Sequence, residues 1–302
     1  MFKRVALILI ALSLWRVAYA ADPLNVIASI PDFADIAREI GGAHVTVESI
    51  ARGVEDPHGV PVRASIAAKL ARADAVIEMG LGMEHAWLPS LLDASNNPKL
   101  RGDGDIQASE GITPKDVPLV VGRTEGEQHA EGNPHFNVGP DSGRTFAKNI
   151  AAGFTKLAPK YAADFDANLK QYLEKLAKKE IEWQAAAKKV KGVKFVSYHP
   201  DMVYFADFLG MEQLGTLEPK PGIPPSASHT ADLIALMKAQ HAQLVLREPQ
   251  YSDDLPREIA SQTGAKVVTI AIMVNGVPGS KTWIDMIDTN IKSIVEALDT
   301  KP

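Results

Sequence analysis

The feature that most constrains the fold is a long helical segment near the middle of the 302-residue chain. Between Pro159 and Lys191, apolar side chains recur on one face at three- to four-residue steps or multiples of them, with lysine and glutamate opposite. The apolar face comprises Phe165, Leu169, Leu173, Leu176 and Trp183. At a rise of 1.5 Å per residue, such a helix is about 45 Å long and can act as a stiff connection. Two shorter helices, broken near Pro159, are the alternative.

Short strands alternate with helices on both sides of this segment. The strand-like runs are 24–30, 45–50, 75–79, 106–108 and 117–121 before it, and 193–198, 213–217, 243–246 and 266–272 after it. This alternation predicts an α/β fold with two lobes, each with a mainly parallel sheet, joined by one long helix. The predicted division is a signal peptide at 1–20, an N-terminal lobe at 21–155, a linking helix at 156–191 and a C-terminal lobe at 192–302.

The first 20 residues have the pattern of an export signal. Lys3 and Arg4 precede an apolar run at 5–15, and the Ala-Tyr-Ala sequence at 18–20 is a small-x-small cleavage site. The apolar run is shorter than the roughly 20 residues that a transmembrane helix needs. We therefore predict that the protein is exported.

The composition limits the partners and the site chemistry. The chain has no cysteine, so an exported form is stabilised without disulfides, and any metal site must use histidine, aspartate or glutamate. The formal net charge is −5 and no basic run occurs, which argues against nucleic acid as a partner. An acidic protein suits a cationic ligand.

Three of the eight histidines lie in loops stiffened by proline. They are His58 in EDPHGVP, His135 in NPHFN and His199 in SYHPD. Proline fixes φ and removes a backbone donor, so these histidines belong to ordered loops. Their distribution predicts one metal site assembled from three loops. Three neutral imidazoles suit Zn²⁺, whereas Mn²⁺ prefers more oxygen donors, and Cu²⁺ and Ni²⁺ remain chemically possible.

The other five histidines are not predicted to be ligands. His44, His229 and His241 lie at the ends of predicted elements. His85 follows a glycine-rich turn, and His129 lies in the acidic loop 122–133, where only a transient contact with a metal is expected.

Several motifs occur in order along the whole mature chain. They are EDPH at 55–58, GLGME at 80–84, NPHFN at 133–137, FVSYHP at 195–200, LGTLEPKPGIPPSASH at 214–229, EPQYS at 248–252 and WIDMIDTNI at 283–291. With these motifs, the chain resembles the periplasmic metal-binding receptors of bacterial ABC importers, in the cluster A-I that handles zinc and manganese. The resemblance implies two lobes joined by a long helix, metal in the cleft between them, and delivery to a membrane permease. It implies a receptor in the periplasm and no enzyme, and we expect a monomer.

The resemblance also implies a set of ligands. The family ligands carry over to His58, His135 and His199, and histidine at the third position favours zinc where manganese receptors have glutamate. The family commonly has a fourth ligand, an aspartate after the last core strand, and the matching position here is Ala271. The open alternatives for the fourth donor are water and the carboxylates of Glu55, Glu248 and Asp285.

Three functions follow from these residues. The first is a receptor that captures Zn²⁺ for an ABC importer. The second is a zinc hydrolase or hydratase, because three histidines with an open fourth position also describe a catalytic zinc, although no general base is assignable. The third is a receptor for another metal (Mn²⁺, Cu²⁺ or Ni²⁺), for a metal complex, or for a partner protein met through the loop 122–133.

Overall fold

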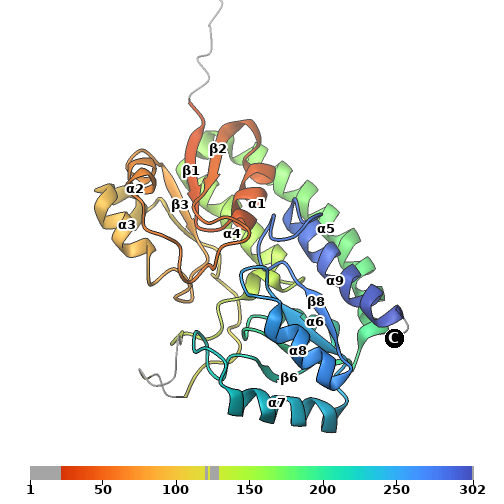
Figure 1. The fold of residues 1–302 in the computed structure, drawn as a ribbon. Coiled ribbons are helices and arrows are strands. Elements are labelled where there is room, and N and C mark those ends of the chain that lie inside the picture. The colour runs from red at the N-terminus through yellow and green to blue at the C-terminus, as the bar shows by residue number, and fades with distance from the viewer. Residues whose placement is uncertain (1–21, 120–121, 123–128, 301–302) are drawn as a thin grey trace, which may run out of the picture.

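The structure is a computed structural model that describes residues 22–119, 122 and 129–300. The predicted signal peptide and part of the loop 122–133 lie outside these ranges. Within them, the chain folds into two lobes, each built on a four-stranded parallel sheet (Figure 1). Among the helices of these ranges, none combines the length and the apolar character that a bilayer span requires.

The N-terminal sheet has the strand order β2-β1-β3-β4. Its strands are β1 (Leu24–Ala28), β2 (Val45–Ser49), β3 (Ala75–Glu78) and β4 (Asp105–Gln107). The helices of this lobe are α1 (Pro31–Gly41), α2 (Ala64–Leu70), α3 (Leu88–Ser95) and α4 (Gly143–Leu157). The strand predicted at 117–121 is wrong over its described residues 117–119. Just before these residues, the chain contacts the C-terminal lobe: the Lys115 amide donates to the hydroxyl of Tyr204 in that lobe at 3.0 Å.

The C-terminal sheet repeats this design with the strand order β6-β5-β7-β8. Its strands are β5 (Lys194–Ser197), β6 (Glu212–Thr216), β7 (Leu244–Arg247) and β8 (Lys266–Thr269). Its helices are α6 (Val203–Leu209), α7 (Ala227–Gln240), α8 (Asp254–Thr263) and α9 (Trp283–Asp299). The last strand ends at Thr269 instead of the predicted Ile272. The reason is that Asn290 binds both backbone groups of Ala271: its Oδ1 accepts the amide at 2.9 Å, and its Nδ2 donates to the carbonyl at 2.7 Å.

The long helix α5 (Ala162–Val190) runs along one side of both lobes, as Figure 1 shows. It follows a 3-10 turn at Pro159–Tyr161, while Leu157 ends α4, so the break near Pro159 precedes the long helix and does not divide it. Its buried residues are Phe165, Tyr172, Leu176, Trp183 and Val190, which lie at steps of four or seven along one face. The amphipathic pattern therefore identified the element that joins the lobes.

The two lobes share a continuous hydrophobic core. Aromatic rings connect the helices: Trp183 of α5 packs on Trp283 of α9 with ring centroids 6.0 Å apart, and Trp283 packs on Phe146 of α4 at 5.2 Å. The same core includes side chains of both sheets, such as Val26 of β1 and Phe195 of β5. Because a rotation of one lobe against the other would expose these rings to water, the core opposes such a motion.

A buried polar contact also joins the lobes. The carboxylate of Asp32, in the first turn of α1, accepts hydrogen bonds from the Val274 amide at 3.0 Å and from Asn137 Nδ2 at 3.2 Å. Asn137 Nδ2 also donates to the Ile272 carbonyl at 2.7 Å. Burial raises the pKa of Asp32 to about 7, although the hydrogen bonds from Val274 and Asn137 oppose this shift. The contact ties α1 to the segment that follows β8.

Candidate metal centre

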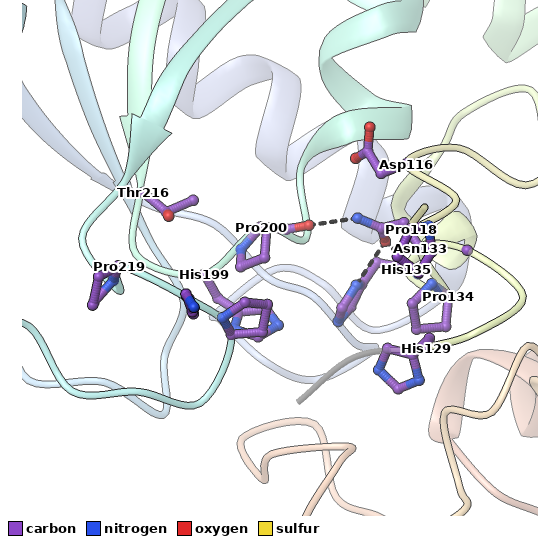
Figure 2. Close-up of a pocket in the computed structure, with 13 residues that line it drawn as sticks. Asp116, Pro118, His129, Asn133, Pro134, His135, His199, Pro200, Thr216 and Pro219 are labelled. Atoms are coloured by element: carbon purple, nitrogen blue, oxygen red, sulfur yellow. Dashed lines mark hydrogen bonds between the residues drawn. The ribbon is translucent and has the colours of Figure 1, made fainter. Parts of the chain in front are cut away.

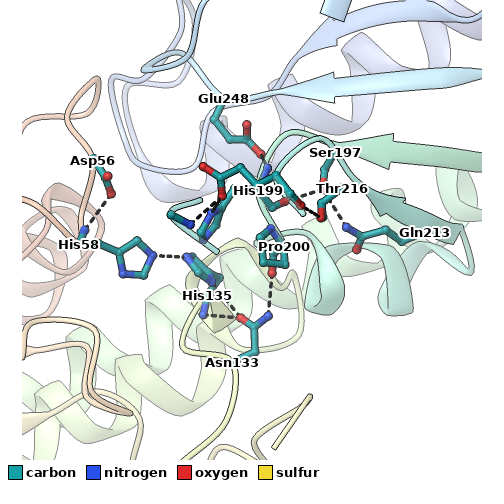
Figure 3. Close-up of polar contacts among 12 residues, drawn as sticks. Asp56, His58, Asn133, His135, Ser197, His199, Pro200, Gln213, Thr216 and Glu248 are labelled. Atoms are coloured by element: carbon teal, nitrogen blue, oxygen red, sulfur yellow. Dashed lines mark hydrogen bonds and ion pairs between the residues drawn. The ribbon is translucent and has the colours of Figure 1, made fainter. Parts of the chain in front are cut away.

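Three separate loops bring His58, His135 and His199 to one place between the lobes (Figure 3). His58 lies in the loop between β2 and α2, His135 directly precedes the 3-10 turn Phe136–Val138, and His199 lies just after β5. Their side chains are buried, with exposed fractions of 5%, 4% and 4%. The carboxyl ends of parallel strands are the usual position of a ligand in such sheets.

The distances among the three imidazoles match a metal site. One possible ligand atom from each histidine lies within 4.8 Å of the others. The ring centroids are 5.0 Å apart for His58 and His135, 5.3 Å for His58 and His199, and 5.1 Å for His135 and His199. The Nε2 atoms of His58 and His135 are 2.9 Å apart. A tetrahedral zinc with bonds of 2.0–2.1 Å separates its nitrogen ligands by about 3.3 Å, so a small expansion accommodates the ion.

Hydrogen bonds behind the ligands set the tautomers of two histidines. His199 Nδ1 lies 2.8 Å from Glu218 Oε2, and a carboxylate can only accept, so Nδ1 donates and Nε2 keeps its lone pair. His135 Nδ1 lies 2.9 Å from Asn133 Oδ1, and Asn133 Nδ2 donates to the Pro200 carbonyl at 2.7 Å, which fixes the amide orientation. In each ring the other nitrogen, Nε2, therefore keeps the lone pair that a metal ion needs.

We expect Glu218→Gln to weaken zinc binding by roughly 10- to 100-fold. Glutamine preserves the size of the side chain and an oxygen acceptor for His199 Nδ1 and for the Gly222 amide, but it removes the negative charge that makes the imidazole more basic. Competition against a chromophoric chelator measures the change. Glu212→Gln, which alters an exposed carboxylate on β6, is the matched control. Equal affinities for the two variants would show that the charge behind His199 contributes nothing.

The loop that carries His58 is held by two contacts. The indole Nε1 of Trp87 donates to the Pro57 carbonyl at 2.9 Å, and the His58 amide donates to Asp56 Oδ1 at 2.9 Å. Trp87 is itself 2% exposed. The proline-rich sequence of the loop and this buried indole together explain why an irregular segment holds a buried side chain in a defined position.

The electrostatic environment keeps the histidines in the form that binds a metal. Burial lowers the pKa of both His58 and His135 well below the usual value, and the neighbouring imidazoles lower it further. Near neutral pH, these rings are therefore uncharged and have a lone pair available.

A pair of buried carboxyl groups lies behind His199. Burial raises the pKa of Asp201 well above its usual range, and the adjacent Glu248 raises it further. Burial also raises the pKa of Glu248, while a hydrogen bond with Asp201 and the His199 imidazole oppose this shift. Burial therefore favours the protonated form of both carboxyl groups, and more strongly for Asp201. Glu248 Oε1 accepts the His199 amide at 3.4 Å, so this carboxyl group lies next to the site.

None of the three carboxylates predicted as possible fourth donors joins the three histidines in the described part of the chain. Glu55 instead binds Arg52 at 2.6 Å, and Glu248 binds the His199 backbone. Asp285 lies in the first turn of α9, where its amide donates to the Thr282 hydroxyl. Ala271 is fully buried and offers no donor atom in its side chain. The candidate donor set among the described residues is therefore three imidazole nitrogens.

The structure places two further histidines, His85 and His129, near the centre, although the sequence predicts neither as a fixed ligand. His129 lines a pocket of about 220 Å³ together with His135 and His199 (Figure 2), and its ring stacks on His58 with centroids 5.1 Å apart. Burial and the neighbouring His85 together lower the pKa of His129 to about 4, although a hydrogen bond with the Gly82 backbone opposes this shift. Two signals in the sequence indicate that these histidines lie near the centre: His85 follows the GLGME turn, and His129 comes just before the NPHFN motif.

The family to which the chain belongs follows from comparison with known proteins. The profile of the family described as zinc-uptake complex component A, periplasmic (ZnuA), matches residues 26–297. The chain belongs to this family. Its two-lobed α/β fold is that of ZnuA: a solved structure of a zinc-bound ZnuA deletion mutant is 28% identical, has a TM-score of 0.78, and is matched over 93% of this chain and 100% of that one.

Characterised relatives of this ZnuA-family chain include receptors named for two metals. The high-affinity zinc uptake system protein ZnuA of Yersinia pestis is 25% identical over 85% of this chain and 87% of its own length. The manganese ABC transporter substrate-binding lipoprotein PsaA of Streptococcus pneumoniae is 24% identical over 93% of this chain and 90% of its own length. The chain is therefore a metal-binding receptor of the ABC-importer type and not an enzyme. The alternative prediction of a zinc hydrolase or hydratase is wrong.

Proposed function

We propose that this receptor captures Zn²⁺ through His58, His135 and His199 and delivers it to the permease of an ABC importer. The observation that carries the proposal is the convergence of three buried, proline-braced imidazoles whose possible ligand atoms lie within 4.8 Å of one another. Zinc accepts three nitrogen ligands and fills a fourth position with water or substrate. Water is the simplest fourth ligand here, because Ala271 replaces the family aspartate.

The donor set favours zinc over manganese. Mn²⁺ prefers carboxylate, carbonyl and water oxygens, and imidazole suits zinc, copper and nickel. Glu218 accepts a hydrogen bond from the ring of His199, and Glu248 accepts one from its backbone amide. These two side chains therefore support the ligand and do not replace it. Groups that hydrogen-bond to a metal-binding histidine orient its ring and tune its basicity. Mn²⁺, Cu²⁺ and Ni²⁺ are the alternatives that a selectivity measurement compares.

The proposal also covers the cellular location, the oligomeric state, the membrane partner and the division into lobes. We propose export by the segment 1–20, action as a monomer in the periplasm, and an ABC permease as the membrane partner. We further propose the lobe division 21–155 and 192–302, with 156–191 as the linking segment that contains α5. Membership of a family of periplasmic receptors for metal import supports the periplasmic location and the permease partner.

A metal titration tests the proposed function. The signal-free protein is stripped of metal and titrated with Zn²⁺ against a chromophoric chelator, with Mn²⁺ in a parallel series. We expect one tight zinc equivalent per chain and much weaker manganese binding, because the described donor set contains nitrogen only. Absent or weak zinc binding, or tighter binding of manganese, would show that replacement of the family aspartate by Ala271 accompanies a different cargo.

A further inference from the structure

The C-terminal lobe reaches the loop of His135 through one buried hydroxyl group. Tyr204 lies in the first turn of α6 and is 5% exposed. Its hydroxyl donates to the Asn133 carbonyl at 2.7 Å and accepts the Lys115 amide at 3.0 Å. Both directions are fixed, because a carbonyl can only accept and an amide can only donate. The hydroxyl therefore connects α6 to two segments that precede the long helix.

The hydroxyl takes the place of a backbone hydrogen bond between these two segments. Lys115 and Asn133 form an isolated antiparallel bridge, in which the Asn133 amide donates to the Lys115 carbonyl at 2.7 Å. A hydrogen-bonded antiparallel pair normally exchanges two such bonds. Here the second bond is replaced by the Tyr204 hydroxyl, which lies between the Lys115 amide and the Asn133 carbonyl. The position of the Asn133 backbone therefore depends on a side chain of the other lobe.

The side chain of Asn133 transmits this position to the predicted ligand. Its Oδ1 accepts the His135 amide at 3.0 Å and lies 2.9 Å from His135 Nδ1, so it orients both the backbone and the ring. Its Nδ2 donates to the carbonyl of Pro200, which directly follows His199 (Figure 3). A shift of the Asn133 backbone therefore changes the direction of the His135 imidazole.

Tyr204 also lies close to the backbone that follows His135. A Cβ atom at Gly139 would be 2.9 Å from the Cβ of Tyr204 and 3.1 Å from the Phe136 carbonyl oxygen. Only glycine fits there without a shift of its neighbours. Gly139 thus permits α6 to pack directly on the ligand segment, which holds the hydroxyl beside Asn133.

We propose that Tyr204 is a positioning residue for the metal site and acts on His135 through Asn133. Its hydroxyl bonds to backbone groups of the ligand segment and leaves the coordination of the ion to the histidines. Because Tyr204 belongs to the C-terminal lobe, the orientation of His135 depends on contact between α6 and this segment. The choice of zinc as the ion rests on the proposed function.

Tyr204→Phe tests the proposal, because phenylalanine keeps the ring and removes the hydroxyl. In a competition titration of the mature protein, we expect zinc affinity to fall by about tenfold with an unchanged circular dichroism spectrum. In the metal-free variant, we expect nitrogen NMR of the imidazoles to show a mixture of His135 tautomers, where the wild type has the proton on Nδ1. Asp207→Asn is the matched control, since it removes the ion pair between α6 and the Lys115 side chain but leaves both hydroxyl bonds. It should keep the wild-type affinity and tautomer.

A double-mutant cycle shows whether Tyr204 acts through Asn133. In Asn133→Ala, the side chain that orients His135 is missing, so the addition of Tyr204→Phe is expected to cause no further loss of zinc affinity. An equal loss of affinity from Tyr204→Phe in both backgrounds would show that Tyr204 acts by another route, and the proposal would be wrong.

The outcomes separate this inference from the proposed function. If the wild type binds no zinc, the proposed function fails, and the tautomer of His135 in metal-free Tyr204→Phe still decides the role of Tyr204. If the wild type and Tyr204→Phe bind zinc equally tightly, and His135 has a single tautomer in both, the function stands and the positioning role is overturned.

Discussion

Replacing His135 by alanine is expected to abolish tight zinc binding. His135 is 4% exposed, its Nε2 lies 2.9 Å from that of His58, and Asn133 fixes its tautomer. Removal of one of three nitrogen donors costs more than the roughly 10- to 100-fold lost with a hydrogen-bonding partner behind a ligand. Competition against a chromophoric chelator at constant pH measures the loss.

Two controls make the His135 result specific. His241→Asn changes an exposed histidine at the end of α7 and is expected to retain the wild-type affinity. His135→Gln keeps a side chain of similar size in case the alanine variant does not fold, which circular dichroism would reveal. Wild-type affinity in a folded His135 variant would mean that zinc binds elsewhere, and the three-histidine assignment would then be wrong.

Replacing Trp183 by alanine is expected to lower the free energy of unfolding by about 3–5 kcal/mol. Trp183 is 2% exposed, packs on Trp283, and donates from its indole nitrogen to Asp288 at 2.6 Å. The substitution leaves a cavity between α5 and α9 and removes the donor for this carboxylate. Urea unfolding followed by circular dichroism measures the change.

Ile181 offers a matched control on the same helix. Its side chain is 70% exposed, so Ile181→Ala should change the free energy of unfolding by no more than about 0.5 kcal/mol. Because both lobes contribute to one core, we expect a single unfolding transition in both variants. A stable Trp183→Ala protein, or two separate transitions, would show that α5 does not couple the lobes.

Much of the architecture was predictable because it depends on local periodicity. The apolar face of 159–191 is formed by α5, and the alternation of strands and helices gives two parallel sheets. A proline next to each of His58, His135 and His199 marked them as ordered, and the structure brings them together. Their role as ligands remains a prediction until metal binding is measured.

The rest of the candidate site depends on contacts between residues distant in the sequence. Glu218 is 19 residues from His199 and follows another strand, so no spacing rule connects them. The acidic and glycine-rich neighbours of His129 predict a solvated loop, but its own ring is packed on His58. The early end of β8 likewise reflects one distant side chain, Asn290, which competes with the sheet for the backbone of Ala271.

The contact between Asp32, Asn137 and Val274 has a consequence for how an ion is captured. Asn137 is two residues from His135, so hydrogen bonds that form on folding hold the ligand loop against both lobes before any ion arrives. The entropy of ordering this loop is therefore lost during folding, and binding does not have to oppose it. A preorganised site of this kind favours a slow release of the ion, so the partner that receives the metal must supply the interaction that loosens the loop.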